Sequence, residues 1–459
     1  MAFRSPRRRS PRGFSITELL IAMTITLMVM AAVASLFGVF GRSLSQSQTT
    51  VDLSGKLRSA AWQLRQDLAG VTVDVVPWAR PESNAGYFEL LEGPQRDTTW
   101  ALATGTVFGS VTGTATNNLE GDTDDVLLFT TRSQGSPFVG KYGTGTFESD
   151  CAEVAWFCRE ASSQTVVGTR LYNLYRRQLL VTGYVGTTEF GGTNAITGTL
   201  PNTTYDLSLR ADGTTLLPNT LGDLTRRENR FMRNGVFSYL NSSSASVTVS
   251  STAFPYAFPL DPTSLRTITN ATFDGVTGRE WEDVVLTNVI GFDVRVFDPQ
   301  AKAQAGTGTT LYPGDPGYVA ASAAGAAGAF VDLFWSGTVT AVASGTAWPP
   351  LTSTTITGPA PTAIASGTGW PPTGQTAFQT AGMQVRNAGS SNTLPVATYD
   401  TWSLHYEFNG ENDDGDTLVD EGTNGADNDA DDQPDDPTEY ETSPPYPVPL
   451  RGIEVRIRC

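Results

Sequence analysis

The sequence has a single histidine, His405, and only three cysteines. One histidine supports neither a credible Ser-His-Asp arrangement nor a histidine metal site, and there is no phosphate-binding loop of the Walker type. Paired carboxylates for glycoside hydrolysis cannot be recognised from sequence alone, and no pattern here indicates such a pair. We therefore expect a protein that is not an enzyme and has no catalytic residues.

Basic residues are also scarce. The chain has 30 Lys and Arg against 47 Asp and Glu, which gives a formal net charge of −17. Five arginines lie within the first 12 residues, so a chain that loses them carries −22: Arg4, Arg7, Arg8, Arg9 and Arg12. Nucleic-acid binding requires a basic surface, so no nucleic-acid partner is indicated. This excess of acidic over basic residues fits a soluble exported domain that binds cations.

One long apolar run is present near the N-terminus. The basic stretch ends at Gly13, and Phe14 follows. Glu18 is the last charged residue before residues 19–40, which contain no charged side chain. About 20 apolar residues at 1.5 Å rise span the hydrocarbon core of a membrane. Basic residues stay on the cytoplasmic side, so this order predicts export of the rest of the chain.

This order of residues resembles the type III signal of type IV pilins and type II secretion pseudopilins. The matching residues are Gly13, Phe14 and Glu18. The resemblance implies that a prepilin peptidase removes residues 1–13 and methylates the new N-terminus at Phe14. It also implies that Glu18 faces the N-terminal ammonium of a neighbouring subunit, because a carboxylate near lipid needs a partner.

Two other interpretations of this segment stay open. An ordinary secretory signal would be cut after a small-residue motif such as residues 32–34, Ala-Val-Ala. An uncleaved membrane anchor is the second. Both explain Glu18 only as a negative charge favoured by a helix N-terminus.

The apolar periodicity predicts one long helix followed by strands. We expect a helix over residues 14–69, membrane-spanning over 14–40 and amphipathic over 41–70, with Gly70 as its stop. Its amphipathic stripe is Leu53, Leu57, Ala60, Ala61, Leu64 and Leu68.

From residue 71 the spacing between apolar residues changes to two, which is typical of β-strands. Strands are expected at 125–130, 153–157, 171–175, 178–185, 246–250 and 290–297. The predicted class is α+β, with an antiparallel β-rich head over 71–298.

Three looser patterns resemble J-type minor pseudopilins and PilW-like minor pilins. They lie at residues 64–68, at 153–157 followed by 171–177, and at 283–292. The resemblance implies a minor structural subunit in the tip or initiation complex of a type IV pilus or a type II secretion pseudopilus. It implies a single-pass protein of the bacterial inner membrane, with a periplasmic head and other pilin-like or pseudopilin subunits as partners. The rival hypothesis is a membrane-anchored exported calcium-binding protein or adhesin that uses the same signal.

Residues 299–396 form a Gly-, Ala-, Thr- and Pro-rich insertion. Residues 340–350 nearly repeat at 362–372, but two copies are too few for a solenoid. The repeated Trp-Pro-Pro units suit an exposed recognition surface, and a flexible insertion is the plainer interpretation.

The last segment, residues 397–459, is expected to be a terminal hairpin with an acidic loop. Residues 411–441 contain 14 carboxylates and no basic side chain. Calcium takes 6–8 oxygen ligands and would relieve their repulsion, whereas a solvated acidic loop is the alternative. The expected ligands are Asn412, Asp414, Asp416 and Glu421 in a partial EF-hand pattern, then Asp427, Asp429 and Asp431. Gly410 stands where an EF-hand loop has its first Asp.

Cysteine pairing is open at this level. Export permits a disulfide. If the strand between Cys151 and Cys158 is continuous, their thiols lie about 23 Å apart, beyond bonding reach. Either that segment bends or one of the two meets Cys459.

Overall fold

The computed structural model describes part of the chain. The described residues are 15–73, 83–92, 122–123, 125–166, 169–182, 196–197, 205–212, 215–226, 229–231, 236–240, 246–250, 283–299, 301–305, 310–313, 328–333, 338–341, 354–357, 383–384, 396–402, 410, 418–420, 424–427 and 450–459. The chain divides into two compact units, Met1–Ser59 and Ala60–Cys459.

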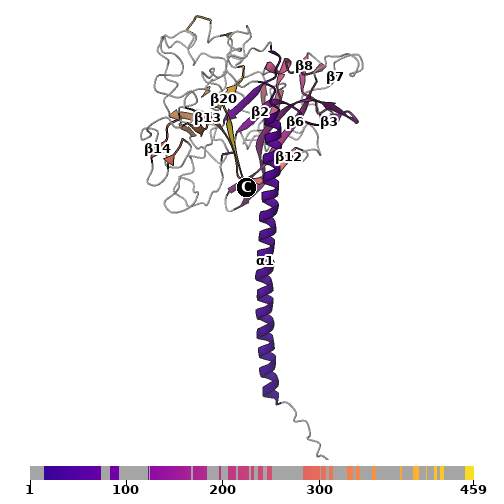
Figure 1. Cartoon of the computed structure of the whole chain (residues 1–459), viewed down its shortest axis with the longest axis vertical. Helices are drawn as coiled ribbons and strands as arrows, with labels where there is room; N and C mark the ends of the chain where they lie inside the picture. Colours follow the sequence, from indigo (N-terminus) through magenta and orange to yellow (C-terminus); the bar gives the residue numbers. More distant parts are fainter. Residues whose placement is uncertain are drawn as a thin grey trace, which may run out of the picture. The chain divides into compact units, whose positions relative to one another are not determined.

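The first unit is the greater part of one helix, α1 (Ile16–Ala69) (Figure 1). The helix ends one residue before Gly70, as the sequence predicts. In the second unit, the Gly70 carbonyl accepts the Arg132 N–H at 2.7 Å, and a Cβ on Gly70 would lie 2.0 Å from the Arg132 carbonyl oxygen. Glycine is therefore required by this close approach of two backbones.

The second unit is built on a seven-stranded antiparallel sheet. Its order is β12 (Val284–Val289), β6 (Thr169–Val181), β5 (Cys151–Val166), β2 (Val126–Arg132), β1 (Phe88–Glu92), β20 (Val396–Asp400) and β19 (Met383–Gln384). Both faces of this sheet are covered at its centre, because every residue of β1 is buried, including Glu89 and Glu92. The observed class is α+β, as predicted.

Smaller sheets complete the described part of this unit. Two have three strands, ordered β16 (Ala329–Val331), β13 (Gly291–Asp298), β21 (Ile453–Arg458), and β7 (Ile196–Thr197), β9 (Thr215–Pro218), β8 (Leu209–Asp212). The two-stranded pairs are β3 (Phe138–Tyr142) with β4 (Gly145–Ser149), β10 (Val236–Leu240) with β11 (Ser246–Ser250), β14 (Gln304–Ala305) with β15 (Thr310–Leu311), and β17 (Thr338–Ala341) with β18 (Thr354–Thr357). A short 3₁₀ helix, η3, covers Asp223–Thr225.

The predicted strands mostly exist, with one difference. The stretches predicted at 171–175 and 178–185 are one strand, β6, because Arg176 and Arg177 lie within the ladder opposite Trp156 and Ala155. The predicted terminal hairpin stays a prediction, because residues 403–409, which lead into the acidic segment, lie outside the described residues. Among the described strands, β20 pairs with β1 and β19, and β21 pairs with β13. Alternation alone identified strands but carried no information on which strands are neighbours.

The core of the second unit is aromatic. Trp156, Phe129 and Tyr87 are fully buried, and the rings of Phe157 and Tyr175 stack at 5.6 Å. Trp402 is 1% exposed and its indole N–H donates to the Gly86 carbonyl at 2.8 Å. A buried indole needs such an acceptor, so this bond fixes the turn before β1.

Candidate functional site

The start of α1 carries a capping box. Ser15 precedes the helix, its hydroxyl accepts the Thr17 N–H at 3.3 Å, and Glu18 accepts the Ser15 N–H at 3.0 Å. This reciprocal pairing satisfies two backbone donors that a helix start leaves without partners. Glu18 thus has a local role within one chain. Gly13 and Phe14, the predicted processing residues, lie outside the described residues.

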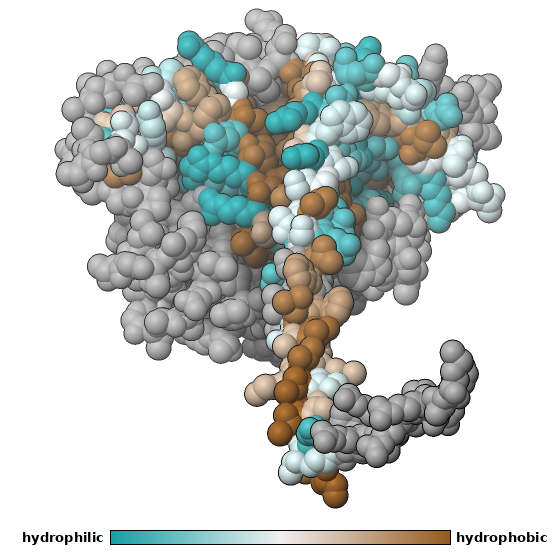
Figure 2. Space-filling model, turned by 60° about the horizontal axis from the view of Figure 1, so that its bottom comes forward, coloured by the Kyte–Doolittle hydropathy of each residue, from teal (hydrophilic) through white to brown (hydrophobic). Residues whose placement is uncertain are grey.

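The apolar half of α1 is long enough to cross a membrane. A span over Ile16–Gly38, 23 residues, has a mean hydropathy of 2.4 and none of it is buried within the structure. Figure 2 shows strongly hydrophobic side chains along this part of the helix. Large apolar side chains left in water are unfavourable, so the segment requires lipid or protein around it.

The last turns of α1 are fastened to the sheet by a buried carboxylate. Asp67 is 3% exposed. Its two oxygens accept from Arg176 on β6, Nε at 2.7 Å and Nη2 at 2.7 Å, and one also accepts the Trp156 indole N–H at 3.0 Å. The Thr131 hydroxyl on β2 donates to the Asp67 carbonyl at 2.6 Å. A bidentate guanidinium–carboxylate pair fixes both distance and orientation.

Asp67 was not identified from the sequence as a buried residue, because the predicted core face of the helix was built from apolar residues alone. The predicted stripe passes through Leu64 and Leu68, yet the buried positions of the second unit's helical segment are Ala60, Leu64 and Asp67. The spacing of four residues from Ala60 to Leu64 and three from Leu64 to Asp67 is the helical signal that was available. A lone acidic residue at a core position indicates a buried cationic partner.

A second buried polar network joins the centre of the sheet to the segment around residues 205–231. Glu153 on β5 accepts from the Tyr87 hydroxyl at 2.6 Å, the Ser208 hydroxyl at 2.6 Å and the Phe231 N–H at 2.7 Å. Burial raises the pKa of Glu153 above its ordinary value, and these three donors oppose the shift. The acceptor oxygens of Glu153 are occupied by protein, so the network is a structural one.

Arg230 extends this network. Its guanidinium, fully buried, lies 3.0 Å from Glu89 and 2.6 Å from Asp400, and 4.1 Å above the Tyr87 ring. β1 and β20 are therefore tied by a shared cation as well as by backbone pairing.

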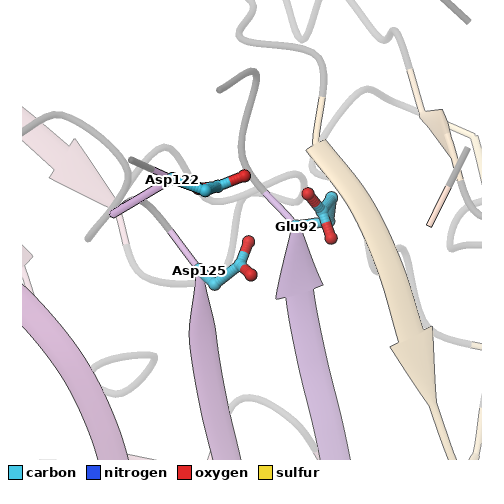
Figure 3. Close-up of side chains that lie close together, drawn as sticks. All are labelled: Glu92, Asp122 and Asp125. Atoms are coloured by element: carbon cyan, nitrogen blue, oxygen red, sulfur yellow. The ribbon is translucent and has the colours of Figure 1, made fainter. Parts of the chain in front are cut away.

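Three more carboxylates gather at one end of β1 and β2. The ligand oxygens of Glu92, Asp122 and Asp125 all lie within 4.8 Å of one another, and all three side chains are buried. Figure 3 shows the side chains directed toward a common point, from the end of β1 and from the residues just before β2. The Val294 N–H donates to Asp125 at 2.6 Å. Such oxygens are the ligand type of calcium and magnesium.

The acidic segment is only partly within the described residues. Of the predicted ligands, Asp427 is described and exposed. Asn412, Asp414, Asp416, Glu421, Asp429 and Asp431 lie outside the described residues. Asp420, which was not predicted as a ligand, accepts the Gly410 N–H at 3.1 and 3.0 Å from a position ten residues away. Its φ of 51°, with φ 76° at Gly410, marks tight turns at both ends of this stretch.

Comparison with known proteins identifies the N-terminal segment. Residues 8–34 match the family model described as the prokaryotic N-terminal methylation motif. No curated protein and no solved structure matches the chain. The matched range contains Gly13, Phe14 and Glu18, and it overlaps the apolar part of α1. The chain therefore carries a type IV pilin-like signal, typical of proteins that prepilin peptidase processes and that assemble with other pilin subunits.

Proposed function

We propose that the chain is a minor pilin-like or pseudopilin-like subunit, resembling the J-type and PilW-like members. It assembles into a type IV pilus or a type II secretion pseudopilus, at the tip or in the initiation complex. The observation that carries the proposal is the methylation-motif match at residues 8–34, which overlaps the start of the continuous helix α1. We propose a structural role and no enzymatic one.

The Asp67 contacts support this role. In such an assembly a subunit is held through its helix and exposes its head. Force applied to the head must therefore be transmitted to the helix. The Asp67–Arg176 pair lies where the helix meets the sheet of the second unit. The size of the second unit, 400 residues by its bounds, favours a minor subunit over one repeated closely along a helical filament.

The proposed placement is a single-pass protein of the bacterial inner membrane with a periplasmic head. Its partners are prepilin peptidase and other pilin-like subunits. The apolar span over Ile16–Gly38 and the five arginines before Gly13 support this orientation.

Co-purification from the native cell tests the proposal. Full-length protein carrying a C-terminal affinity tag is cross-linked in cells and isolated, and its partners are identified by mass spectrometry. We expect other proteins with the same N-terminal signal among them. Recovery of none would favour the alternative, a membrane-anchored exported calcium-binding protein or adhesin.

We also propose calcium as a ligand of the acidic segment. The Gly410–Asp420 contact supports it, because it brings together the ends of a stretch that contains Asn412, Asp414 and Asp416. A closed stretch presents its oxygens to one point at lower entropic cost than an open one. Glu421, Asp427, Asp429 and Asp431 would complete the ligand set.

A further inference from the structure

The three cysteines are free thiols in the structure: Cys151, Cys158 and Cys459. β5 is continuous from Cys151 through Cys158, and each residue between them has a ladder partner on β6. The two are seven positions apart on one strand, so their side chains point to opposite faces of the sheet. The segment does not bend, which excludes a bond between Cys151 and Cys158.

Two routes through the structure lead from Cys158 to the end of β21. Along the seven-stranded sheet, Cys158 lies opposite Leu174, and Leu174 lies opposite Leu286 of β12. β12 ends at Val289, and the next residue, Ile290, donates its N–H to the Arg458 carbonyl at 2.8 Å. Cys459 follows Arg458 directly.

The second route passes through Asp125. Val126 at the start of β2 lies opposite Phe157, so Asp125 is beside Cys158 at the same end of the sheet. Asp125 accepts the Val294 N–H at 2.6 Å, and Val294 pairs with Val455 of β21. Both routes connect Cys158 to β21 through paired or hydrogen-bonded residues, so the last strand lies in the same region of the second unit as Cys158.

The electrostatics agree with this placement. Burial raises the pKa of the Cys158 thiol well above its ordinary value, and the nearby Cys459 and Asp125 raise it further. Burial also raises the pKa of Cys459 to about 11. A disulfide carries no charge, so joining these two thiols adds no charged group to the interior.

We infer that Cys158 and Cys459 form a disulfide that ties β21 to the seven-stranded sheet, while Cys151 stays a thiol. The inference rests on the export that the proposed function requires, because disulfides persist in oxidising compartments. The bond closes a loop that includes the insertion and the acidic segment, and long loops gain most from closure.

The oxidant is a disulfide, either of a dithiol oxidant protein or of a small molecule. The half-buried Cys459 is the more accessible thiol and attacks first, forming a mixed disulfide and releasing one thiol of the oxidant. Cys158 then attacks the Cys459 sulfur and releases the second. Two thiols are oxidised to one disulfide, and one disulfide is reduced to two thiols.

Oxidation of the purified full-length protein with oxidised glutathione tests this pairing. The remaining thiols are alkylated, the protein is digested without reductant, and linked peptides are identified by mass spectrometry. We expect a peptide pair joining Cys158 to Cys459, with Cys151 alkylated. The pair should disappear in Cys459→Ser and persist in the control Cys151→Ser. Three alkylated cysteines, or a bond to Cys151, would overturn the inference.

A second measurement covers variants that fold poorly. In the wild type, reductant should lower the midpoint of thermal unfolding, and in Cys459→Ser it should have no effect. An equal effect of reductant on both would also overturn the inference. Neither readout depends on the cell compartment, so failure here would leave the proposed assembly function in place.

Discussion

Asp67 at the end of α1 and Arg176 on β6 form a bidentate ion pair, with Nη2 to Oδ1 at 2.7 Å and side-chain exposures of 4% and 11%. The residues are 109 positions apart. The pair joins the helix segment of the second unit to its central sheet, so helix docking depends on a charge as well as on apolar contact.

Removing the carboxylate should therefore destabilise the second unit. Asp67→Ala leaves the buried guanidinium and the Trp156 indole N–H without this acceptor, which costs on the order of 3–5 kcal/mol. Urea unfolding of the full-length protein in detergent, followed by tryptophan fluorescence, measures the loss. Arg65→Ala, at an exposed position two residues away, is the matched control. If both variants unfold alike, the ion pair contributes nothing specific.

The double variant gives a sharper test of the same contact. Asp67→Ala and Arg176→Ala should be strongly non-additive, since each removes the same interaction. Additive losses would mean that the two side chains stabilise the protein independently.

Glu153 predicts a pH dependence of stability. Its pKa is raised from the ordinary 4.5, mainly by burial, so the folded protein holds this proton more tightly than the unfolded chain does. The stability from this group is fully present below pH 4.5 and is lost as pH rises through the folded pKa. Glu153→Gln keeps one of the two acceptor oxygens and does not titrate, so it should flatten the fall in unfolding free energy above pH 4.5. An unchanged slope would contradict the assignment.

Glu18 has two roles that one pair of variants separates. Its carboxylate caps the helix through the Ser15 N–H, and the proposed assembly needs its charge opposite a neighbour's Phe14 ammonium. Glu18→Gln retains the cap, because Gln serves in a capping box, but removes the charge. We expect both Glu18→Gln and Glu18→Ala to insert in the membrane and to fail in co-purification with other pilin-like proteins.

Asp52→Ala is the matched control, an exposed carboxylate on the same helix that should co-purify normally. Normal assembly of Glu18→Gln with failure of Glu18→Ala would show that capping alone explains the residue.

Calcium should stabilise the second unit at roughly millimolar concentration, as in extracellular calcium modules. A hundredfold excess over Kd adds about 2.7 kcal/mol. Thermal unfolding of the full-length protein with calcium against chelator is the measurement. Asp414→Asn with Glu421→Gln should abolish the shift, whereas Asp125→Asn in the buried carboxylate cluster should retain it. A shift abolished only by Asp125→Asn would move the calcium site to that cluster.

The positions of the helix and strands could be predicted from the sequence, but the contacts between distant residues could not. The helix and its stop at Gly70 follow from periodicity and from the backbone freedom of glycine, both local properties. The helical spacing places Asp67 among core positions but does not identify its partner Arg176, which lies on a distant strand. Glu153 and Arg230 could not be recognised, because their partners also lie on distant segments. The carboxylates Glu92 and Asp125 meet only because β1 and β2 are neighbours.

The mature N-terminus tests the account most directly. Membrane protein from the native cell is isolated, and its N-terminal peptide is identified by mass spectrometry. We expect a chain that begins at Phe14 with one methyl group on its amine, and slower maturation in Gly13→Ala. A chain that begins at Ser35, or one that retains its first 13 residues, would contradict the pilin-like account.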